Sequence, residues 1–359
     1  MKKKIKIFLG GYPNFLNAQN INCRALSEHL DKNRFQVSTM LFPFQNANDF
    51  ERVEGVEYIR LHRPVRLFRY LAYLKGIAQA DIAFLPKGEI DGYCRTVAKL
   101  FNTKVFTTLE GVIDDDSLGY LCNSAEERKK YIDHFRQYEP NLYSITKFLA
   151  DVTAQQRGFR FADRILYLGV ESANFVKPQR KEKQLTDIIF IGNLPYPRKN
   201  IHDFLDVAAL CPDITFHMVG GNQLKDCTVE EYIKKNQLPN LVYHGHLDHS
   251  RLSALLANID LMYFPSRSEG FPKVHLETAC AGVPTLCYGD YGAAEWIKSG
   301  VNGIIVDNKE QALVVINELR ANPAKLKQLS DNAIELGKSF DWGRLVGAWE
   351  TEIEKMYNQ

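Results

Sequence analysis

The chain of 359 residues is too long for one ordinary hydrophobic core, so we expect two domains of roughly 150–200 residues each. Apolar residues make up 45% of the chain and charged residues 25%, which is typical of a globular protein. A formal net charge of +2 gives no general electrostatic case for nucleic-acid binding, and no stretch of about eighteen apolar residues predicts a membrane span.

The predicted elements begin with an apolar strand from Ile5 to Leu9, followed by Gly10-Gly11 and a helix. Near residue 187 this plan repeats, because a β-branched run again ends at a glycine, Gly192, and leads into a helix. Further short apolar runs alternate with helical stretches: DIAFLP, KVFTTLEG, NLYSIT and RILYLG in the first half, and ITFHMVGG, LVYHGHL, DLMYFPS, PTLCYG and NGIIVD in the second. This alternation predicts two Rossmann-like α/β domains with parallel sheets buried on both faces.

The segment between the two halves, VESANFVKPQRKEKQLT, is rich in charge and lacks apolar periodicity. We interpret residues 171–184 as a linker between an amino-terminal domain (1–170) and a carboxyl-terminal domain (185–340). Ligands of open α/β sheets bind beyond the carboxyl ends of the strands, so the loops that follow the strands are expected to hold the functional residues.

Seven cysteines form no Cys-x-x-Cys pair and lie scattered in apolar segments. An odd, scattered set predicts reduced, buried thiols in a cytoplasmic protein. The lysine-rich amino terminus is followed by an apolar run that is too short for a signal peptide.

The loop GNLPYPRKN places Arg198 and Lys199 at the start of a helix that Asn200 could cap. Two cations beside exposed helix N–H groups predict an anion site, most simply for phosphate; a solvated basic turn is the alternative. Gly10-Gly11 could let a phosphate or another backbone approach closely, or could form only a tight turn. The pair is not part of a Gly-x-Gly-x-x-Gly motif, which disfavours a nicotinamide dinucleotide site.

Two carboxylates flank a Phe-Pro step in SEGFPKVHLE, which runs from Ser268 to Glu277. Pro272 fits the first position of a helix, so Glu269 is expected in the loop before it and Glu277 in its second turn. The helix N-terminus favours an anion, Glu269 would reach a sugar beside it, and Glu277 could accept two hydrogen bonds from a ribose diol. The pattern indicates a nucleotide sugar; the alternative is an acidic loop plus one helix carboxylate.

The stretch SEGFPKVHLETACAGVPTL resembles the Glu-x7-Glu signature of the family-four retaining glycosyltransferases, which have the two-Rossmann (GT-B) fold. The resemblance extends over most of the chain: FIGNLPYPRKN is similar to the family's phosphate loop, YGAAEWIKSGVNGIIVD to its closing stretch, and FDWGRLVGAWETEIEKMY to its final helix. It implies two domains that face each other across a cleft, with a helix of about 341–359 completing the first domain.

The resemblance implies that Lys199 neutralises the leaving diphosphate, Glu277 holds the nucleotide ribose and Glu269 lies beside the donor sugar. It also implies a reaction that retains the anomeric configuration, needs no metal or other cofactor, and is catalysed by stabilising charge on the diphosphate. The implied catalytic residues are Glu269, Lys199, Arg198 and Glu110. The implied donor-binding residues are Gly10, Gly11, Asn193, Arg198, Lys199, Gly270, Phe271, Pro272, Lys273, Val274 and Glu277.

Two positions depart from the family's pattern. Asn193 stands where an arginine is common, and Arg198 could supply that cation. Glu110 stands where many members have a histidine after an amino-terminal strand, and a carboxylate there could bind a sugar hydroxyl or act on the acceptor. These departures keep a weakly active, nucleotide-sugar-binding relative open as an alternative function. A nicotinamide oxidoreductase is a further alternative, which the missing glycine motif disfavours.

The expected acceptor is a glycan or a lipid-linked saccharide. Residues 60–76, RLHRPVRLFRYLAYLKG, form a basic amphipathic stretch that could lie on the inner face of an anionic membrane or be an ordinary solvated face. Pro64 limits the usable helix there to about three turns. Several histidines show no metal-ligand spacing, and we interpret them as structural or surface residues: His134, His217, His244, His246, His249 and His275.

Overall fold

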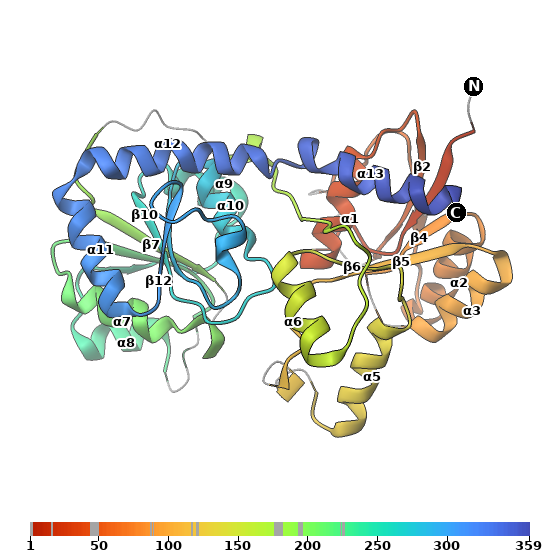
Figure 1. The fold of residues 1–359 in the computed structure, drawn as a ribbon, viewed down its shortest axis with the longest axis horizontal. Coiled ribbons are helices and arrows are strands. Elements are labelled where there is room, and N and C mark those ends of the chain that lie inside the picture. The colour runs from red at the N-terminus through yellow and green to blue at the C-terminus, as the bar shows by residue number, and fades with distance from the viewer. Residues whose placement is uncertain are drawn as a thin grey trace. The chain divides into compact units, whose positions relative to one another are not determined.

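The structure is a computed structural model that describes residues 3–15, 17–43, 50–86, 88, 90–115, 118–119, 122–175, 182–192, 197–222, 224 and 227–359. The chain divides into two compact units, one made of Met1–Leu168 with Trp342–Gln359 and the other of Gly169–Asp341. Each unit is a parallel sheet with helices packed around it (Figure 1), as the alternation of strands and helices predicts.

In the first unit, the described residues form a sheet of six parallel strands in the order β3-β2-β1-β4-β5-β6. Its strands are β1 (Ile5–Leu9), β2 (Phe35–Leu41), β3 (Val56–Arg60), β4 (Ile82–Phe84), β5 (Lys104–Leu109) and β6 (Leu142–Ser144). Its helices are α1 (Ala18–His29), α2 (Val65–Ala78), α3 (Asp91–Phe101), α5 (Ala125–Arg136), α6 (Lys147–Arg157) and α13 (Trp342–Asn358).

In the second unit, the described residues also form six parallel strands, in the order β12-β11-β10-β7-β8-β9. They are β7 (Asp187–Gly192), β8 (Thr215–Gly220), β9 (Leu241–Tyr243), β10 (Leu261–Phe264), β11 (Thr285–Tyr288) and β12 (Gly303–Val306). Its helices are α7 (Ile201–Leu210), α8 (Val229–Asn236), α9 (His249–Leu256), α10 (Lys273–Cys280), α11 (Lys309–Ala321) and α12 (Pro323–Ser339), and its 3-10 turns are η2 (Ser172–Asn174), η3 (Pro197–Lys199) and η4 (Ala293–Glu295).

An aromatic core holds the middle of the second sheet together. Phe190 of β7 stacks on Phe264 of β10, with 5.8 Å between the ring centroids and 15° between the planes. Phe204 of α7 packs against Phe190 at 5.6 Å and edge-on against Phe216 of β8 at 5.4 Å. All four rings are buried. The ends of β7 and β10 are therefore rigid supports for the loops that follow them.

The carboxyl-terminal helix α13 is part of the first unit, where it packs beside α1 and β4 (Figure 1). Trp349 is buried and meets Phe84 of β4 edge-on at 5.6 Å, and its indole N–H donates to the carbonyl of Tyr167 at 3.1 Å. Glu350 pairs with Arg34, with 2.7 Å between the carboxylate and the guanidinium. Since these contacts join sequence-distant segments, the helix closes the core of the first unit.

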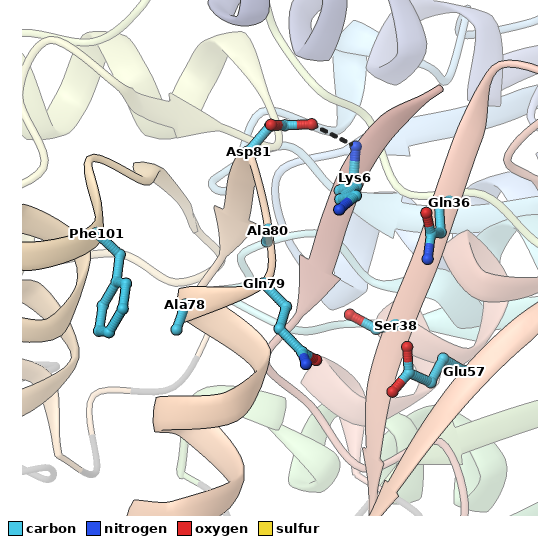
Figure 2. A pocket seen from close by; sticks show the side chains of 9 residues that line it. All are labelled: Lys6, Gln36, Ser38, Glu57, Ala78, Gln79, Ala80, Asp81 and Phe101. Atoms are coloured by element: carbon cyan, nitrogen blue, oxygen red, sulfur yellow. Dashed lines mark hydrogen bonds between the residues drawn. The ribbon is translucent and has the colours of Figure 1, made fainter. Parts of the chain in front are cut away.

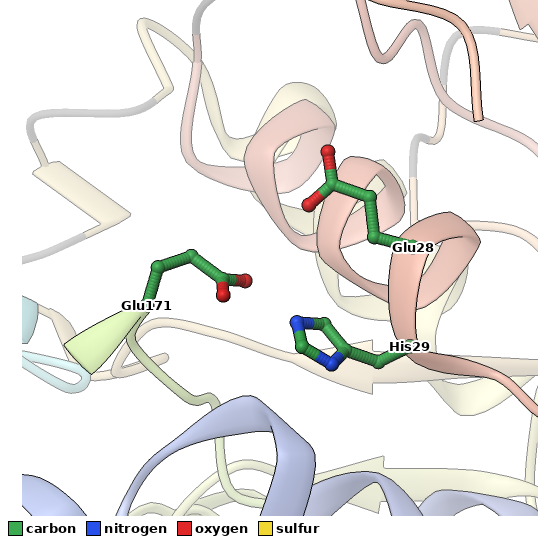
Figure 3. Close-up of side chains that lie close together, drawn as sticks. All are labelled: Glu28, His29 and Glu171. Carbon is green, nitrogen blue, oxygen red and sulfur yellow. The ribbon is translucent and has the colours of Figure 1, made fainter. Parts of the chain in front are cut away.

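Helix α1 follows the glycine pair and carries its own end signals. Asn17 caps it by accepting a hydrogen bond from the Asn20 N–H at 2.9 Å. Glu28 and His29 lie next to each other in its last turn (Figure 3), and Glu28 pairs with Arg24 one turn earlier at 2.9 Å. His29 near the carboxyl end suits the helix dipole when it is protonated.

The seven cysteines are all free thiols, and all are buried except the half-buried Cys227. This confirms the interpretation of the cysteines as buried, unpaired thiols. Among the described residues, no helix combines the length and the apolar character that crossing a bilayer requires.

Candidate active site

The carboxyl ends of β7 and β10 lie next to each other, because these two strands are neighbours in the second sheet. The strands are parallel, so the chain leaves both from the same edge, the carboxyl edge of the sheet. Along the chain, η3 is the next described element after β7, and α10 is the next after β10. This topology gathers the predicted Lys199, Glu269 and Glu277 at one edge of the second unit.

Lys199 and Glu269 form an ion pair, with 2.7 Å between Nζ and Oε1. Their side chains are only 21% and 13% exposed. The Lys199 ammonium also lies 5.0 Å from the centroid of the Phe264 ring, within the range of a cation–π contact. Because limited exposure lowers the effective dielectric, this pair is held more firmly than an ordinary surface ion pair.

Two residues just after β10 attach this pair to η3. The Ser266 hydroxyl donates to Glu269 Oε1 at 2.5 Å and lies 3.0 Å from the Arg198 carbonyl oxygen. The Arg267 N–H donates to the same carbonyl at 2.8 Å. Ser266 was not among the predicted residues, although a serine directly after a predicted strand and three residues before Glu269 is a signal that could have identified it.

Glu277 lies one and a half turns into α10, as predicted, and is half-buried. Pro272 is the residue before the helix rather than its first member, with φ −75° and ψ 94°. Burial raises the pKa of the Glu277 carboxyl, and the nearby His249 and Lys273 lower it in part. Within the described part of the chain no donor hydrogen-bonds to this carboxylate, so it can accept bonds from a ligand hydroxyl.

His275, on the opposite side of α10, is completely buried and has a structural role, in agreement with its interpretation from the sequence. The Trp296 indole N–H donates to its Nδ1 at 3.1 Å, which requires that nitrogen to be unprotonated. Its Nε2 lies 3.3 Å from the Tyr291 hydroxyl, and its ring meets Phe264 edge-on at 4.9 Å. Burial, and to a lesser degree the charge of Lys199, lower its pKa from 6.5 to about 3. The imidazole is therefore neutral.

The predicted cap of α7 by Asn200 is wrong. Asn200 precedes the helix, but it adopts the left-handed region at φ 46° and its side chain does not cap the first turn. Its amide instead donates to Asp203 at 2.6 Å, and the Tyr288 hydroxyl donates to the same carboxylate oxygen at 2.6 Å. The Asn200 side chain therefore bonds the Asp203 carboxylate in the first turn of α7 in place of a backbone N–H.

Among the other predicted residues of this unit, Phe271 is buried and packs against Trp296 at 5.1 Å and Phe340 at 5.8 Å. Its ring anchors the loop before α10. The backbone of residues 270–274 runs from this loop into the first turn of the helix. Asn193 lies outside the described residues.

The predicted residues of the first unit sit at the carboxyl edge of its own sheet. Glu110 follows β5, and its Oε1 accepts hydrogen bonds from the Asn22 amide at 3.3 Å and the Thr108 hydroxyl at 3.2 Å. A Cβ on Gly10 would lie 3.0 Å from the Phe84 carbonyl oxygen. One on Gly11 would lie 2.6 Å from the sulfur of Cys23. The glycine pair therefore permits close packing against β4 and α1, one of the two roles that the sequence left open.

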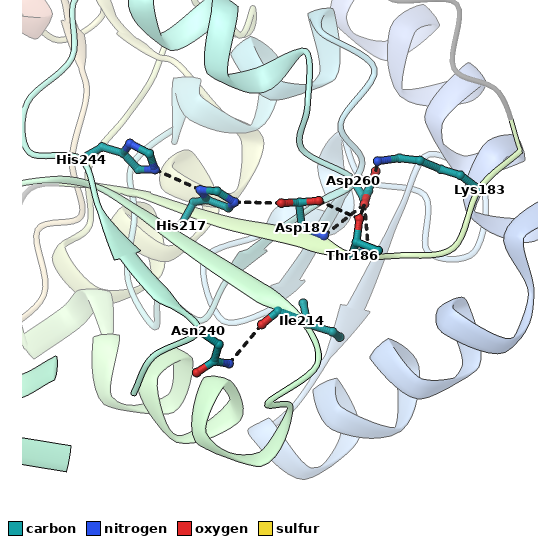
Figure 4. Close-up of polar contacts among 8 residues, drawn as sticks. All are labelled: Lys183, Thr186, Asp187, Ile214, His217, Asn240, His244 and Asp260. Atoms are coloured by element: carbon teal, nitrogen blue, oxygen red, sulfur yellow. Dashed lines mark hydrogen bonds and ion pairs between the residues drawn. The ribbon is translucent and has the colours of Figure 1, made fainter. Parts of the chain in front are cut away.

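His217 and His244 are also structural (Figure 4). His217 Nε2 lies 3.0 Å from the Asp187 carboxylate, and its Nδ1 lies 2.9 Å from His244 Nε2. Burial lowers the pKa of His244, and the charge of His217 adds to this. The chain of side chains ties β7 and β8 to the residue that follows β9. Asp260, nearby in the same view, accepts hydrogen bonds from the N–H groups of residues 186 and 187.

A polar cavity of about 520 Å³ lies in the first unit, at the amino edge of its sheet (Figure 2). Its lining residues come from β1, β2 and β3, from the ends of α2 and α3, and from the segment between α2 and β4: Lys6, Gln36, Ser38, Glu57, Ala78, Gln79, Ala80, Asp81 and Phe101. This is the edge opposite to Gly10-Gly11 and Glu110, and no predicted site residue lines it.

Comparisons with known proteins agree with this geometry. Residues 171–336 match the family model of glycosyl transferases group 1. This matching segment makes up less than half of the chain. It contains Lys199, Glu269 and Glu277, so the resemblance predicted from the Glu-x7-Glu stretch is confirmed.

Curated relatives match about half of the chain or less. The alpha-galactosylglucosyldiacylglycerol synthase of Streptococcus pneumoniae is 33% identical over 162 residues, which cover 44% of this chain and 43% of the relative. The glycogen synthase of Mycobacterium tuberculosis is 28% identical over 190 residues, which cover 50% of this chain and 45% of the relative. The chain thus spans less than half the length of these relatives, whose names agree with the predicted class of enzyme, a glycosyltransferase.

Solved structures match over nearly the whole chain. Sucrose-phosphate synthase from Thermosynechococcus elongatus has a TM-score of 0.78 at 15% identity, with 99% of this chain and 100% of that chain covered. Anabaena HepE in complex with UDP and glucose has a TM-score of 0.77 at 14% identity, with coverage of 98% and 100%. At these identities the likeness concerns the fold, and it confirms the predicted GT-B fold.

Proposed function

We propose that the protein is a retaining glycosyltransferase that moves a hexose-type sugar from a nucleotide-diphosphate sugar to a glycan or lipid-linked acceptor without a metal ion. The observation that carries the proposal is the Lys199–Glu269 pair at the carboxyl edge of the second sheet, beside the helix that presents Glu277. Within the segment that matches the group 1 family model, these three side chains supply a cation, a sugar-binding carboxylate and a ribose-binding carboxylate.

The diphosphate of the donor would bind Lys199 and the positive end of the α10 dipole at its N-terminus, since both favour negative charge. Arg198, the neighbour of Lys199 on η3, adds a second cation at this place. Negative charge grows on the diphosphate as the sugar leaves, so cations fixed in a partly buried site lower the barrier to this step. They would supply the stabilisation that a divalent metal supplies in other enzymes.

Glu277 would accept hydrogen bonds from both hydroxyls of the nucleotide ribose. Its carboxyl group is partly desolvated in the free protein, so donors from a ribose diol would replace lost water and favour the ionised form. Glu269 would then accept from a hydroxyl of the sugar. In the first unit, Glu110 would face the acceptor, and the Gly10-Gly11 loop would lie at the boundary between donor and acceptor. The acceptor attacks from the side on which the diphosphate departs.

Calorimetric titration of UDP, GDP and ADP tests this proposal, with NADH as the ligand of the competing oxidoreductase reading. We expect one diphosphate to bind, and Glu277→Ala to weaken it about tenfold to a hundredfold, the range for hydrogen bonds to a charged group. Glu318→Ala is the matched control, because Glu318 is an exposed carboxylate on α11. Binding of NADH alone, or equal affinity of wild type and Glu277→Ala, would contradict the proposal.

We propose further that the first turns of α2 contact an anionic membrane on its cytoplasmic side. Helix α2 begins directly after Pro64 and continues to Ala78, longer than the predicted three turns. Leu67 and Leu71, one turn apart on it, are 55% and 47% exposed, and Arg66 beside them is exposed. Two exposed leucines with a basic neighbour suit the boundary between anionic headgroups and acyl chains.

Co-sedimentation with phosphatidylglycerol vesicles tests the membrane contact, with phosphatidylcholine vesicles as the uncharged comparison. We expect binding to the anionic vesicles only, and a loss of about tenfold in the Leu67→Ser/Leu71→Ser double variant. Leu100→Ser on α3 is the control, because Leu100 is a leucine on a different helix and is even more exposed, at 76%. Binding that the double variant retains would assign the contact to another surface.

A further inference from the structure

Ser266 is completely buried, and its hydroxyl contacts both Glu269 and the η3 turn that carries Lys199. It follows β10, and its Oγ lies 2.5 Å from Glu269 Oε1 and 3.0 Å from the Arg198 carbonyl oxygen. Both neighbours are acceptors, and a serine hydroxyl has one proton to donate. The shorter contact, to the charged acceptor, takes that proton, since charge-assisted O–H···O bonds are the shorter ones.

The Arg198 carbonyl does not depend on Ser266, because it accepts from the Arg267 N–H at 2.8 Å. This backbone bond fastens η3, which carries Lys199, to the turn that carries Ser266. The two segments that carry the hydroxyl and the ammonium are therefore tied together through the backbone, and both groups contact the carboxylate of Glu269.

Lys199 and Ser266 both donate to the same oxygen of Glu269, Oε1. In the described part of the chain no hydrogen bond reaches Oε2, which leaves it available to a ligand hydroxyl. A diphosphate that binds the Lys199 ammonium competes with Glu269 for it. Once the ammonium turns to the diphosphate, Ser266 is the donor that still holds Glu269 in place.

We propose that Ser266 is a positioning residue of the transfer reaction, holding the Glu269 carboxylate towards the donor sugar while Lys199 neutralises the diphosphate. This rests on the proposed function, in which Glu269 binds the sugar. Ser266 itself contacts neither the sugar nor the diphosphate, so it affects turnover through the orientation of Glu269. The affinity for the nucleotide, which Glu277 and Lys199 provide, does not depend on it.

Ser266→Ala tests the proposal, and Ser330→Ala is its matched control. Ser330 on α12 is equally buried, and its hydroxyl donates to the Gly282 carbonyl at 2.5 Å, away from Lys199 and Glu269. Each substitution removes one buried hydroxyl with one short hydrogen bond, so both should lower the melting temperature by similar amounts. We would measure diphosphate affinity by calorimetry and the release of diphosphate from UDP-, GDP- and ADP-glucose.

For Ser266→Ala we expect kcat to fall about tenfold to a hundredfold with unchanged diphosphate affinity, while Ser330→Ala keeps the wild-type kcat. A crystal structure of Ser266→Ala should show the Glu269 carboxylate displaced. Equal kcat in the two variants, or a loss of affinity that matches the loss of kcat, would overturn the positioning role and leave the proposed function standing. A wild-type protein that binds none of the diphosphates and releases none would overturn both.

Discussion

Acidification should destabilise the protein through His275, and Glu277's helix would be the element affected. The imidazole is completely buried and its pKa falls from 6.5 to about 3, first because of burial and second because of the charge of Lys199. Below pH 6.5 the unfolded chain binds a proton at this residue and the folded chain does not. The unfolded state therefore gains stability as the pH falls, and the free energy of unfolding decreases.

The size of the destabilisation follows from the lowering of the His275 pKa. Between the two pKa values each pH unit costs about 1.4 kcal/mol, since one unit of pKa difference corresponds to that free energy. Near pH 7.5 both states carry a neutral imidazole and the cost is close to zero. At pH 5, about one and a half units below the ordinary value, His275 alone should lower the free energy of unfolding by about 2 kcal/mol.

His275→Gln isolates this contribution, because a glutamine can accept from the Trp296 indole N–H but does not titrate. Urea unfolding at pH 7.5 and pH 5 gives the free energy of unfolding of each protein. We expect the difference between variant and wild type to shift by about 2 kcal/mol in favour of the variant at pH 5. His246→Gln, at an exposed histidine, should show no such shift.

A difference between His275→Gln and wild type that is the same at both pH values would refute the reasoning. It would mean that the folded protein admits a proton at this position, and that His275 of α10 is not held as a buried, neutral imidazole in solution.

Lys199→Ala should lower kcat about a hundredfold or more, as the loss of a preorganised charge does, while Glu269 stays bonded to Ser266. Turnover kinetics check this expectation, and an unchanged kcat would contradict it. Gly11→Ala should lower the free energy of unfolding by about 1–3 kcal/mol, because the added Cβ would lie 2.6 Å from the sulfur of Cys23. An unchanged midpoint of urea unfolding would show that the loop adjusts freely. Trp349→Ala should lower the free energy of unfolding of the first unit by about 3–5 kcal/mol, because it opens a cavity beside Phe84. A retained melting temperature would mean that α13 does not close the core.

The α/β class followed from local patterns in the sequence. The run from Ile188 to Phe190 forms a strand buried on both faces, and the glycine after it ends that strand, because apolar runs of this length can be satisfied only inside a covered sheet. The Glu-x7-Glu spacing likewise predicted one carboxylate before a helix and one within it, since Pro272 marks where that helix begins. These conclusions required only neighbouring residues.

The contacts among distant residues came only from the tertiary structure. The pairing of Lys199 with Glu269 depends on β7 and β10 being adjacent, and a strand order cannot be deduced from the strands themselves. Asn200 had the residue type of a helix cap, but its side chain donates to the Asp203 carboxylate, which Tyr288 also bonds. The sequence also did not predict that Ser266 and His275 are completely buried. Local propensity thus determined the elements and the class of fold, while the direction of each functional side chain was decided by which distant groups the packed sheet brought within hydrogen-bonding distance.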